Sequence, residues 1–283
     1  MAKRDTKRIN RIDAMFARLR EEDRKAFVTF TVASDPSFEE SLARLKTFVA
    51  SGIDLIEIGH PFSDPILDGA TIQKANRRAL AAGGNLRKTL ELCRAFRQTD
   101  DRTPLILMGY SNPVVTMGYE RFAEAAADAG IDGLIAADFP LREADELVRT
   151  LAKHGLSMIP LAAPTLDARD FAVEKPGIGG FLYCIPVVGP TGGPSASKEV
   201  IAEAVERCRR QSNLPVMVGF GVKTPELAAD IAKVADGVIV ATALIDRFLE
   251  IDREFPGDNE RFHAIVADTL LGYRGAIDAA TID

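Results

Sequence analysis

The sequence predicts an α/β protein, a (β/α)8 (TIM) barrel formed as a single domain over residues 1–283, with an additional helix before the first strand. Three observations support this prediction: eight short apolar runs alternate with helical patterns, one segment recurs three times, and no linker divides the chain. The runs are apolar throughout, as strands buried on both faces of a parallel sheet require. A right-handed strand-to-helix crossover repeated eight times makes either an open doubly wound sheet or a closed barrel.

The predicted strands are bounded by Gly, Pro or Asp. In order they are AFVTFTV (26–32), DLIEIG (54–59), PLILMG (104–109), DGLIAA (132–137), LSMIPL (156–161), GFLYCI (180–185), LPVMVGF (214–220) and DGVIVA (236–241). Helical patterns lie between them at 38–52, 89–98, 119–130, 143–155, 196–210 and 224–234. The apolar spacing of INRIDAMFARLR (9–20) predicts the additional helix, which we expect to cover one end of the barrel.

The recurring segment decides between an open and a closed sheet. Near copies are found at SGIDLIEIG (51–59), AGIDGLIAAD (129–138) and KVADGVIVAT (233–242), on the second, fourth and eighth predicted strands. The same strand-and-helix unit repeated around the chain favours a closed ring of equivalent units. We therefore predict a barrel.

Composition excludes several classes of protein. With 47% apolar residues, the chain can bury roughly 73% of its unfolded surface, which excludes intrinsic disorder. No apolar run reaches about 18 residues, so no membrane span is expected. A net charge of −6 argues against a nucleic-acid partner. The short basic start lacks a signal-peptide core, and the three cysteines are widely spaced, so we expect a cytoplasmic protein with reduced thiols.

Glu57 is the first candidate for chemistry. It stands between Ile56 and Ile58 near the end of the second predicted strand, and barrel enzymes place reactive groups at the carboxyl ends of strands. Apolar surroundings raise the pKa of a carboxyl group, which allows it to donate a proton near neutral pH. The alternative is a structural glutamate in a salt bridge, and we favour function because an unpaired buried charge is costly.

The loop that follows, HPFSDPILDGA (60–70), contains Asp64 and Asp68. Asp64 begins an ordinary Asp-Pro turn. Asp68 precedes a helical pattern, so composition alone leaves open whether it is a helix N-cap or a functional carboxylate.

Glycine-rich segments follow three later strands. VVGPTGGPSAS (187–197) is either a hinged lid or a surface loop, and its position favours a lid. GFG (219–221) allows a close approach of the backbone to a ligand. Ala241 and Thr242 begin a helix whose free N–H groups can hold a phosphate, although Thr242 is alternatively only a cap. GIGG (177–180) lies at the other end of the barrel and is interpreted as a turn.

Several motifs together resemble the tryptophan synthase α-chain family over nearly the whole chain. They are IEIGHPFSDPILDG (56–69), LMGYSNPV, GLIAADFP, GPTGG, VGFGV followed by TPE, and DGVIVATAL, in the order that the family shows. The resemblance implies an aldol-type lyase that cleaves indole-3-glycerol phosphate to indole and glyceraldehyde 3-phosphate. It implies no metal and no other cofactor.

The resemblance also implies roles for individual residues. Glu57 is expected to be the acid and base, and Asp68 the partner of the indole N–H. The substrate-binding residues implied are Tyr183, Phe27, Met108, Ile135 and Thr191, with Thr191 closing the lid onto Asp68. The phosphate contacts implied are Gly192, Phe220, Gly221, Ala241 and Thr242. For each of the apolar residues, plain core packing is the alternative.

Family members act with a β chain in an α2β2 complex, so a β-chain partner is implied. A second hypothesis is a catalytically weak α-like subunit that binds and regulates the β chain, because Val187, Val188, Ala241 and Thr242 depart from the family's usual lid and phosphate residues. The presence of Glu57, Asp68 and Tyr183 together argues against it. A third hypothesis, another phosphosugar-handling barrel such as an isomerase, does not account for the motif around Glu57.

Overall fold

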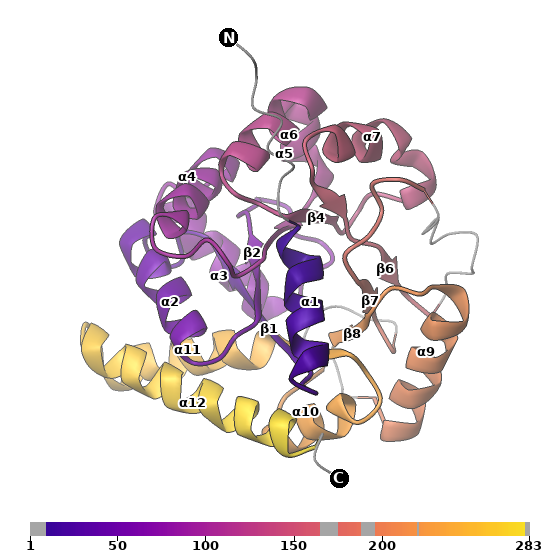
Figure 1. Ribbon diagram of the computed structural model, residues 1–283. Coiled ribbons are helices and arrows are strands. Elements are labelled where there is room, and N and C mark those ends of the chain that lie inside the picture. Colours follow the sequence, from indigo (N-terminus) through magenta and orange to yellow (C-terminus); the bar gives the residue numbers. More distant parts are fainter. Residues whose placement is uncertain (1–9, 165–174, 188–195, 220, 281–283) are drawn as a thin grey trace.

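A computed structural model describes residues 10–164, 175–187, 196–219 and 221–280 (Figure 1). All paired strands run parallel, in the order β5-β4-β3-β2-β1-β9-β8-β7-β6. The strands are β1 (Ala26–Val32), β2 (Leu55–Gly59), β3 (Leu105–Gly109), β4 (Gly133–Ala136), β5 (Ser157–Met158), β6 (Leu161–Ala162), β7 (Leu182–Cys184), β8 (Val216–Gly219) and β9 (Gly237–Val240).

Helices follow the strands and surround them (Figure 1). Their bounds are α1 (Arg11–Glu21), α2 (Phe38–Ala50), α3 (Ala70–Ala81), α4 (Leu86–Arg97), α5 (Ser111–Met117), α6 (Tyr119–Asp128), η1 (Leu141–Glu143), α7 (Asp145–Lys153), α9 (Lys198–Gln211), α10 (Pro225–Ala232), α11 (Thr242–Glu254) and α12 (Asn259–Ala279). Side-chain caps start several of them: Ser37, Asn85, Ser197 and Thr224 each accept a hydrogen bond from an N–H group in the first turn. No described helix is long and apolar enough to cross a membrane.

The sheet closes through the fifth predicted strand, which is divided into β5 and β6. β5 pairs with β4, and β6 pairs with β7, so this one segment joins the two ends of the strand order. Pro160 stands between the two halves and has no N–H group to donate, which interrupts the ladder there. Its carbonyl still accepts the N–H of Tyr183 at 3.0 Å. The prediction of a (β/α)8 barrel is confirmed.

Two groups of buried side chains divide the core. The inner core lies inside the ring and includes Ala26, Val28, Leu55, Ile106, Ile135, Ile159, Phe181, Tyr183, Met217 and Ile239. The outer core lies between strands and helices and includes Phe27, Ile56 and Ile58. The apolar face of α1, formed by Ile12, Met15, Phe16 and Leu19, belongs to the inner core, and α1 lies across the centre of the ring in Figure 1. The predicted additional helix therefore covers one end of the barrel.

The three recurring segments share one structural device, which we call the aspartate clamp. In each segment an aspartate precedes the strand, and its carboxylate accepts the N–H group of a residue at the start of the neighbouring strand. The carboxylate pairs are Asp54 with Phe27 at 3.0 Å, Asp132 with Leu105 at 2.9 Å and Asp236 with Val216 at 2.8 Å. The N–H of each aspartate donates to the carbonyl of the same residue. The repeat therefore fixes the register of strand pairs at the start of the strands.

Each clamp aspartate pairs with at least one arginine. Asp54 contacts Arg18 and Arg274 at 2.9 and 3.1 Å, whereas Asp236 contacts only the half-exposed Arg209, at 3.4 Å, among the ion pairs of the described residues. Arg274 extends from α12 and its side chain is 6% exposed. The clamp at Asp54 thus joins α1, β1 and α12. Its ion pair with Arg274 is buried, whereas Arg18 of α1 is 47% exposed.

Replacing Asp54 by Ala should lower the free energy of unfolding by about 3 kcal/mol, because the buried Arg274 loses the carboxylate that pairs it with β1. Asp236→Ala is the matched control, and its loss should be near 1 kcal/mol because Arg209 remains in water. Urea unfolding of both variants measures this difference. Equal losses would show that the buried arginine adds nothing to the clamp.

Candidate active site

The site lies inside the ring, beyond the part that α1 fills. Side chains alternate along β2, so Leu55 belongs to the inner core while Ile56 and Ile58 belong to the outer core. Glu57 therefore faces the interior, next to Phe30 of β1 and Ile106 of β3 in the register of the sheet. Because α1 packs on the inner core, the ends of the strands opposite to it are the part of the interior left for a ligand.

Glu57 is completely buried and lacks any charge partner among the described residues. Neither carboxyl oxygen has a hydrogen-bond partner there. Burial alone raises the pKa of this carboxyl group from 4.5 to about 8. Glu57 is therefore mainly protonated at neutral pH, and the alternative of a salt-bridged structural glutamate finds no support among the described residues.

Tyr183 of β7 faces the same interior. Burial, and then the charge on Glu57, raise the pKa of the phenol well above its ordinary value. Its hydroxyl lies against the backbone of β8, where a Cβ at Gly219 would come within 2.3 Å of the oxygen. The glycine at 219 is thus required by the tyrosine ring, and Tyr183 links Glu57 to the cavity described next.

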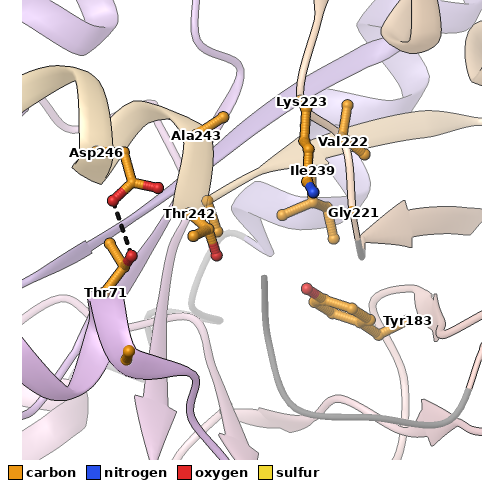
Figure 2. Close-up of a pocket in the computed structure, with 11 residues that line it drawn as sticks. Thr71, Tyr183, Gly221, Val222, Lys223, Ile239, Thr242, Ala243 and Asp246 are labelled. Atoms are coloured by element: carbon orange, nitrogen blue, oxygen red, sulfur yellow. Dashed lines mark hydrogen bonds between the residues drawn. The ribbon is translucent and has the colours of Figure 1, made fainter. Parts of the chain in front are cut away.

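A cavity of about 460 Å³ opens beside Tyr183, as Figure 2 shows. Its lining consists of Ala70, Thr71, Tyr183, Gly221, Val222, Lys223, Ile239, Ala241, Thr242, Ala243 and Asp246. These residues come from the loop after β8, the start of α11, the start of α3 and the ring interior. We call this cavity the phosphate cradle, after the ligand that the sequence predicts for it.

The start of α11 offers the cradle backbone donors that have no partner among the described residues. Ala241 is the N-cap, and no side chain caps the helix, so the first N–H groups have no partner within the helix. The positive end of the helix dipole adds to their attraction for an anion. Thr242 is the first residue of the helix and not its cap, so the capping alternative for Thr242 is wrong.

Asp68 lies at the end of the loop that follows β2. The hydroxyl of Tyr110 donates to its carboxylate at 3.2 Å and accepts the N–H of Leu67 at 3.0 Å. Gly69 is the N-cap of α3, and no side chain caps that helix. The alternative in which Asp68 is a helix cap is therefore wrong, and Tyr110 holds the loop in place.

The apolar residues predicted for the indole pocket differ in where they lie. Ile135 belongs to the inner core, and Met108 packs against both cores. The placement of Phe27 in the pocket is wrong, because its ring is in the outer core and stacks on Tyr273 of α12, with ring centroids 6.0 Å apart. Phe27 is the immediate neighbour of both Ala26 and Val28, which face the interior, so the alternation of β1 turns it towards the helices.

Phe30 takes the place that was predicted for Phe27. Phe30 packs with the outer core as well, but the alternation of β1 gives it the orientation of Ala26 and Val28. A Cβ at Gly59 would lie 2.7 Å from its ring. It also lines a small cavity with Asp68, Met108 and Tyr110. Phe30 is the residue of β1 that pairs with Glu57 of β2. Aligning the first two predicted strands and taking the neighbour of Glu57 would therefore have found it.

His60 is a second residue that sequence analysis missed as part of the site. Its side chain is buried, and burial lowers its pKa to about 4, so the ring is neutral at physiological pH. A Cβ at Gly109 would lie 2.3 Å from Nε2, so the imidazole fills the space that a side chain at 109 would need. Three predicted residues, Thr191, Gly192 and Phe220, lie outside the described residues.

No group of three or more His, Cys, Asp or Glu side chains that could hold a metal ion occurs in the described part of the chain. The arrangement instead combines a neutral buried acid, a second carboxylate and a cradle for an anion. In a barrel, such groups at one end of the strands are typical of enzymes, and this set is suited to proton transfer on a substrate that carries an anionic group.

Comparison with known proteins identifies the family. The family model described as the tryptophan synthase alpha chain matches residues 16–268. The tryptophan synthase alpha chain of Phenylobacterium zucineum is 52% identical over 240 residues, which cover 85% of this chain and 87% of that protein. The corresponding protein of Caulobacter vibrioides is 50% identical over 237 residues, covering 84% and 86%.

Solved structures agree. The tryptophan synthase subunit alpha of Legionella pneumophila superposes with a TM-score of 0.88 at 39% identity, covering 96% of this chain and 100% of that chain. A chain of Mycobacterium tuberculosis tryptophan synthase gives a TM-score of 0.81 at 34% identity, with coverages of 93% and 98%. The chain belongs to the tryptophan synthase alpha chain family. It has the α-subunit role in tryptophan biosynthesis, that of a carbon–carbon lyase acting on indole-3-glycerol phosphate.

The buried carboxyl group should make stability depend on pH. Between the unfolded value of 4.5 and the folded value of about 8, the folded chain holds a proton on Glu57 that the unfolded chain has lost. The free energy of unfolding should therefore fall as pH rises, by up to about 1.4 kcal/mol per pH unit from this group. Glu57→Gln removes this pH-dependent contribution, because the amide does not titrate.

Urea unfolding of the wild type and of Glu57→Gln between pH 5 and pH 9 measures the effect. The stability of the variant relative to the wild type should increase with pH and become constant above about 8. Parallel pH profiles for the two proteins would contradict the raised pKa.

Proposed function

We propose that Glu57 both donates and recovers the proton in the cleavage of indole-3-glycerol phosphate. The single observation that supports this most is its complete burial without a charge partner, which keeps the carboxyl group neutral at pH 7. A neutral acid is needed because the indole carbon C3 must be protonated before the bond to the glycerol chain can break. Protonation creates an indoleninium cation.

The second half of the reaction uses the same group. After donating its proton, Glu57 is an ionised carboxylate with no positively charged side chain beside it among the described residues, so its apolar surroundings favour recovery of a proton. It removes the hydroxyl proton of the adjacent glycerol carbon as the carbon–carbon bond breaks. The bonding electrons return to the ring, indole leaves, and the former alcohol becomes the aldehyde of glyceraldehyde 3-phosphate. Glu57 ends the cycle protonated, so the proton balance closes.

Asp68 is proposed to accept the indole N–H and to stabilise the positive charge on the protonated ring. The hydrogen bond from Tyr110 supports this role, because it orients the carboxylate from the loop after β2. The phosphate cradle is proposed to bind the phosphate through the N–H groups at the start of α11, with Gly221, Ala241 and Thr242 as contacts. Tyr183, Phe30, Met108 and Ile135 are proposed to form the walls for the remainder of the substrate.

A β chain is the proposed partner, in an α2β2 assembly as in the family. An apolar cavity of about 510 Å³ beside the loop after β2 supports a docking role, since Ile66 and Leu67 line it. Ile66 and Leu67 are 79% and 44% exposed, and adjacent exposed apolar side chains are a feature of interaction surfaces. The cytoplasm is the proposed location, because Cys93, Cys184 and Cys208 are free and buried thiols.

Glu57→Gln should lower the rate of indole release by at least about 10²-fold, because an amide can neither donate nor recover the proton. In the wild type, kcat/KM should fall tenfold per pH unit above about 8, where Glu57 ionises. The assay uses purified chain and indole-3-glycerol phosphate, with and without a β chain. Near-normal turnover by the folded variant would eliminate the mechanism.

The same assay separates the competing hypotheses. Slow turnover by the wild type, alone and with the β chain, combined with activation of the β chain would favour the catalytically weak regulatory subunit. Isomerisation of a phosphosugar without indole release would favour the unrelated barrel enzyme.

Asp68→Asn should bind substrate but lower kcat by about 10²-fold, because the amide cannot stabilise the positive charge on the ring. Its stability should stay within about 0.5 kcal/mol of the wild type, since Asp68 does not cap α3. Asp64→Asn, an exposed carboxylate in the same loop, is the matched control and should leave kcat of the isolated chain unchanged. Equal kcat for the two variants would remove the proposed role of Asp68.

A further inference from the structure

We propose that Lys223 binds the substrate phosphate through its side-chain ammonium group, as the positively charged side chain of the phosphate cradle. The inference rests on the proposed function and assigns one further residue to it. Lys223 is the only cation among the described residues that line the cradle. Figure 2 shows its side chain extending into the cavity, towards the space between α11 and Tyr183.

The backbone around Lys223 is fixed from both sides. Its carbonyl accepts a hydrogen bond from the hydroxyl of Tyr273 on α12 at 2.8 Å. The next residue, Thr224, caps α10 by accepting the N–H of Leu227. Two residues earlier, Gly221 has a φ of 68°, which turns the chain at the end of β8. These contacts place the start of the lysine side chain at the rim of the cradle, while the chain itself remains free to reach a ligand.

The lysine ammonium is not engaged elsewhere. No ion pair or side-chain hydrogen bond of Lys223 is found within residues 10–164, 175–187, 196–219 and 221–280. The one carboxylate among the cradle's lining residues, Asp246, instead accepts a hydrogen bond from Thr71 at 2.7 Å (Figure 2). Within the described part of the chain, the cradle therefore contains a cation without a partner and a carboxylate that already has a donor.

Electrostatics explain why a charged side chain matters here. A phosphate monoester carries about −1.5 to −2 charges at pH 7. The chain has a net charge of −6, and Asp246 adds a negative charge inside the cradle, so the overall field opposes the ligand. The start of α11 offers the equivalent of about +0.5 charge. A lysine, which is a compact charge on a flexible stem, supplies the remainder at the point where the phosphate sits.

Lys223→Met tests the role, because methionine keeps much of the apolar stem and removes the charge. It should raise the KM for indole-3-glycerol phosphate and the inhibition constant of inorganic phosphate by about tenfold each, while kcat changes less than twofold. Inhibition by indole, which has no phosphate, should not change. Lys223→Arg should recover most of the phosphate affinity.

The matched control is Lys233→Met at the other end of α10. Lys233 is exposed and pairs with Asp230 at 4.0 Å, so the variant changes the net charge equally without altering the cradle. It should leave KM and the inhibition constant of inorganic phosphate unchanged. Equal effects in the two variants would mean that only net charge matters and would overturn the assignment.

Other results are equally decisive. Unchanged phosphate inhibition in Lys223→Met, with an active wild type, overturns the role of Lys223 and leaves the proposed function intact. An absence of any inhibition of the wild type by phosphate overturns the cradle and Lys223 together. Calorimetry measures the binding of inorganic phosphate to the wild type and to Lys223→Met. If phosphate binds the wild type more tightly than the variant, but the wild type releases no indole, the role of Lys223 is supported and the proposed reaction is contradicted.

Discussion

The alternation of side chains along parallel strands is the constraint on which the arrangement of this molecule depends. In a closed ring, every second residue of a strand must face inwards, and the interior is too narrow for solvent. Glu57 faces inwards because Ile56 and Ile58 are needed outside, against the helices. Its altered acidity is thus a consequence of strand geometry, and needs no special contact from another side chain.

The two ends of the ring carry different tasks. At the end where the strands begin, α1 fills the interior and the aspartate clamps fix how neighbouring strands align. At the other end, strand residues and loops turn polar groups towards the cradle. Interactions that hold the fold and interactions that meet a ligand are therefore separated along the barrel axis. Loops at the reactive end are free to differ without disturbing the strand register.

Sequence analysis located the strands because a short apolar run bounded by turn residues indicates a buried strand whatever the rest of the fold. It located Glu57 because a lone carboxyl group within such a run is conspicuous. It failed for Phe27 because β1 is buried on both faces, so apolar character does not tell the inside from the outside. Sequence analysis missed three other groups: the hydroxyl of Tyr110, the ring of His60 and the ammonium of Lys223. Each lies beside elements that are distant in sequence, and no local sequence pattern predicts such a contact.

The hydrogen bond between Thr71 and Asp246 has a mechanical consequence. Thr71 lies in the first turn of α3, three residues after Asp68, and Asp246 belongs to α11, the helix that opens towards the anion. The bond fastens these two helices to each other across the mouth of the ring. If the substrate binds as proposed, with its phosphate at the start of α11 and its indole near Asp68, this hydrogen bond holds the two binding positions at a fixed separation.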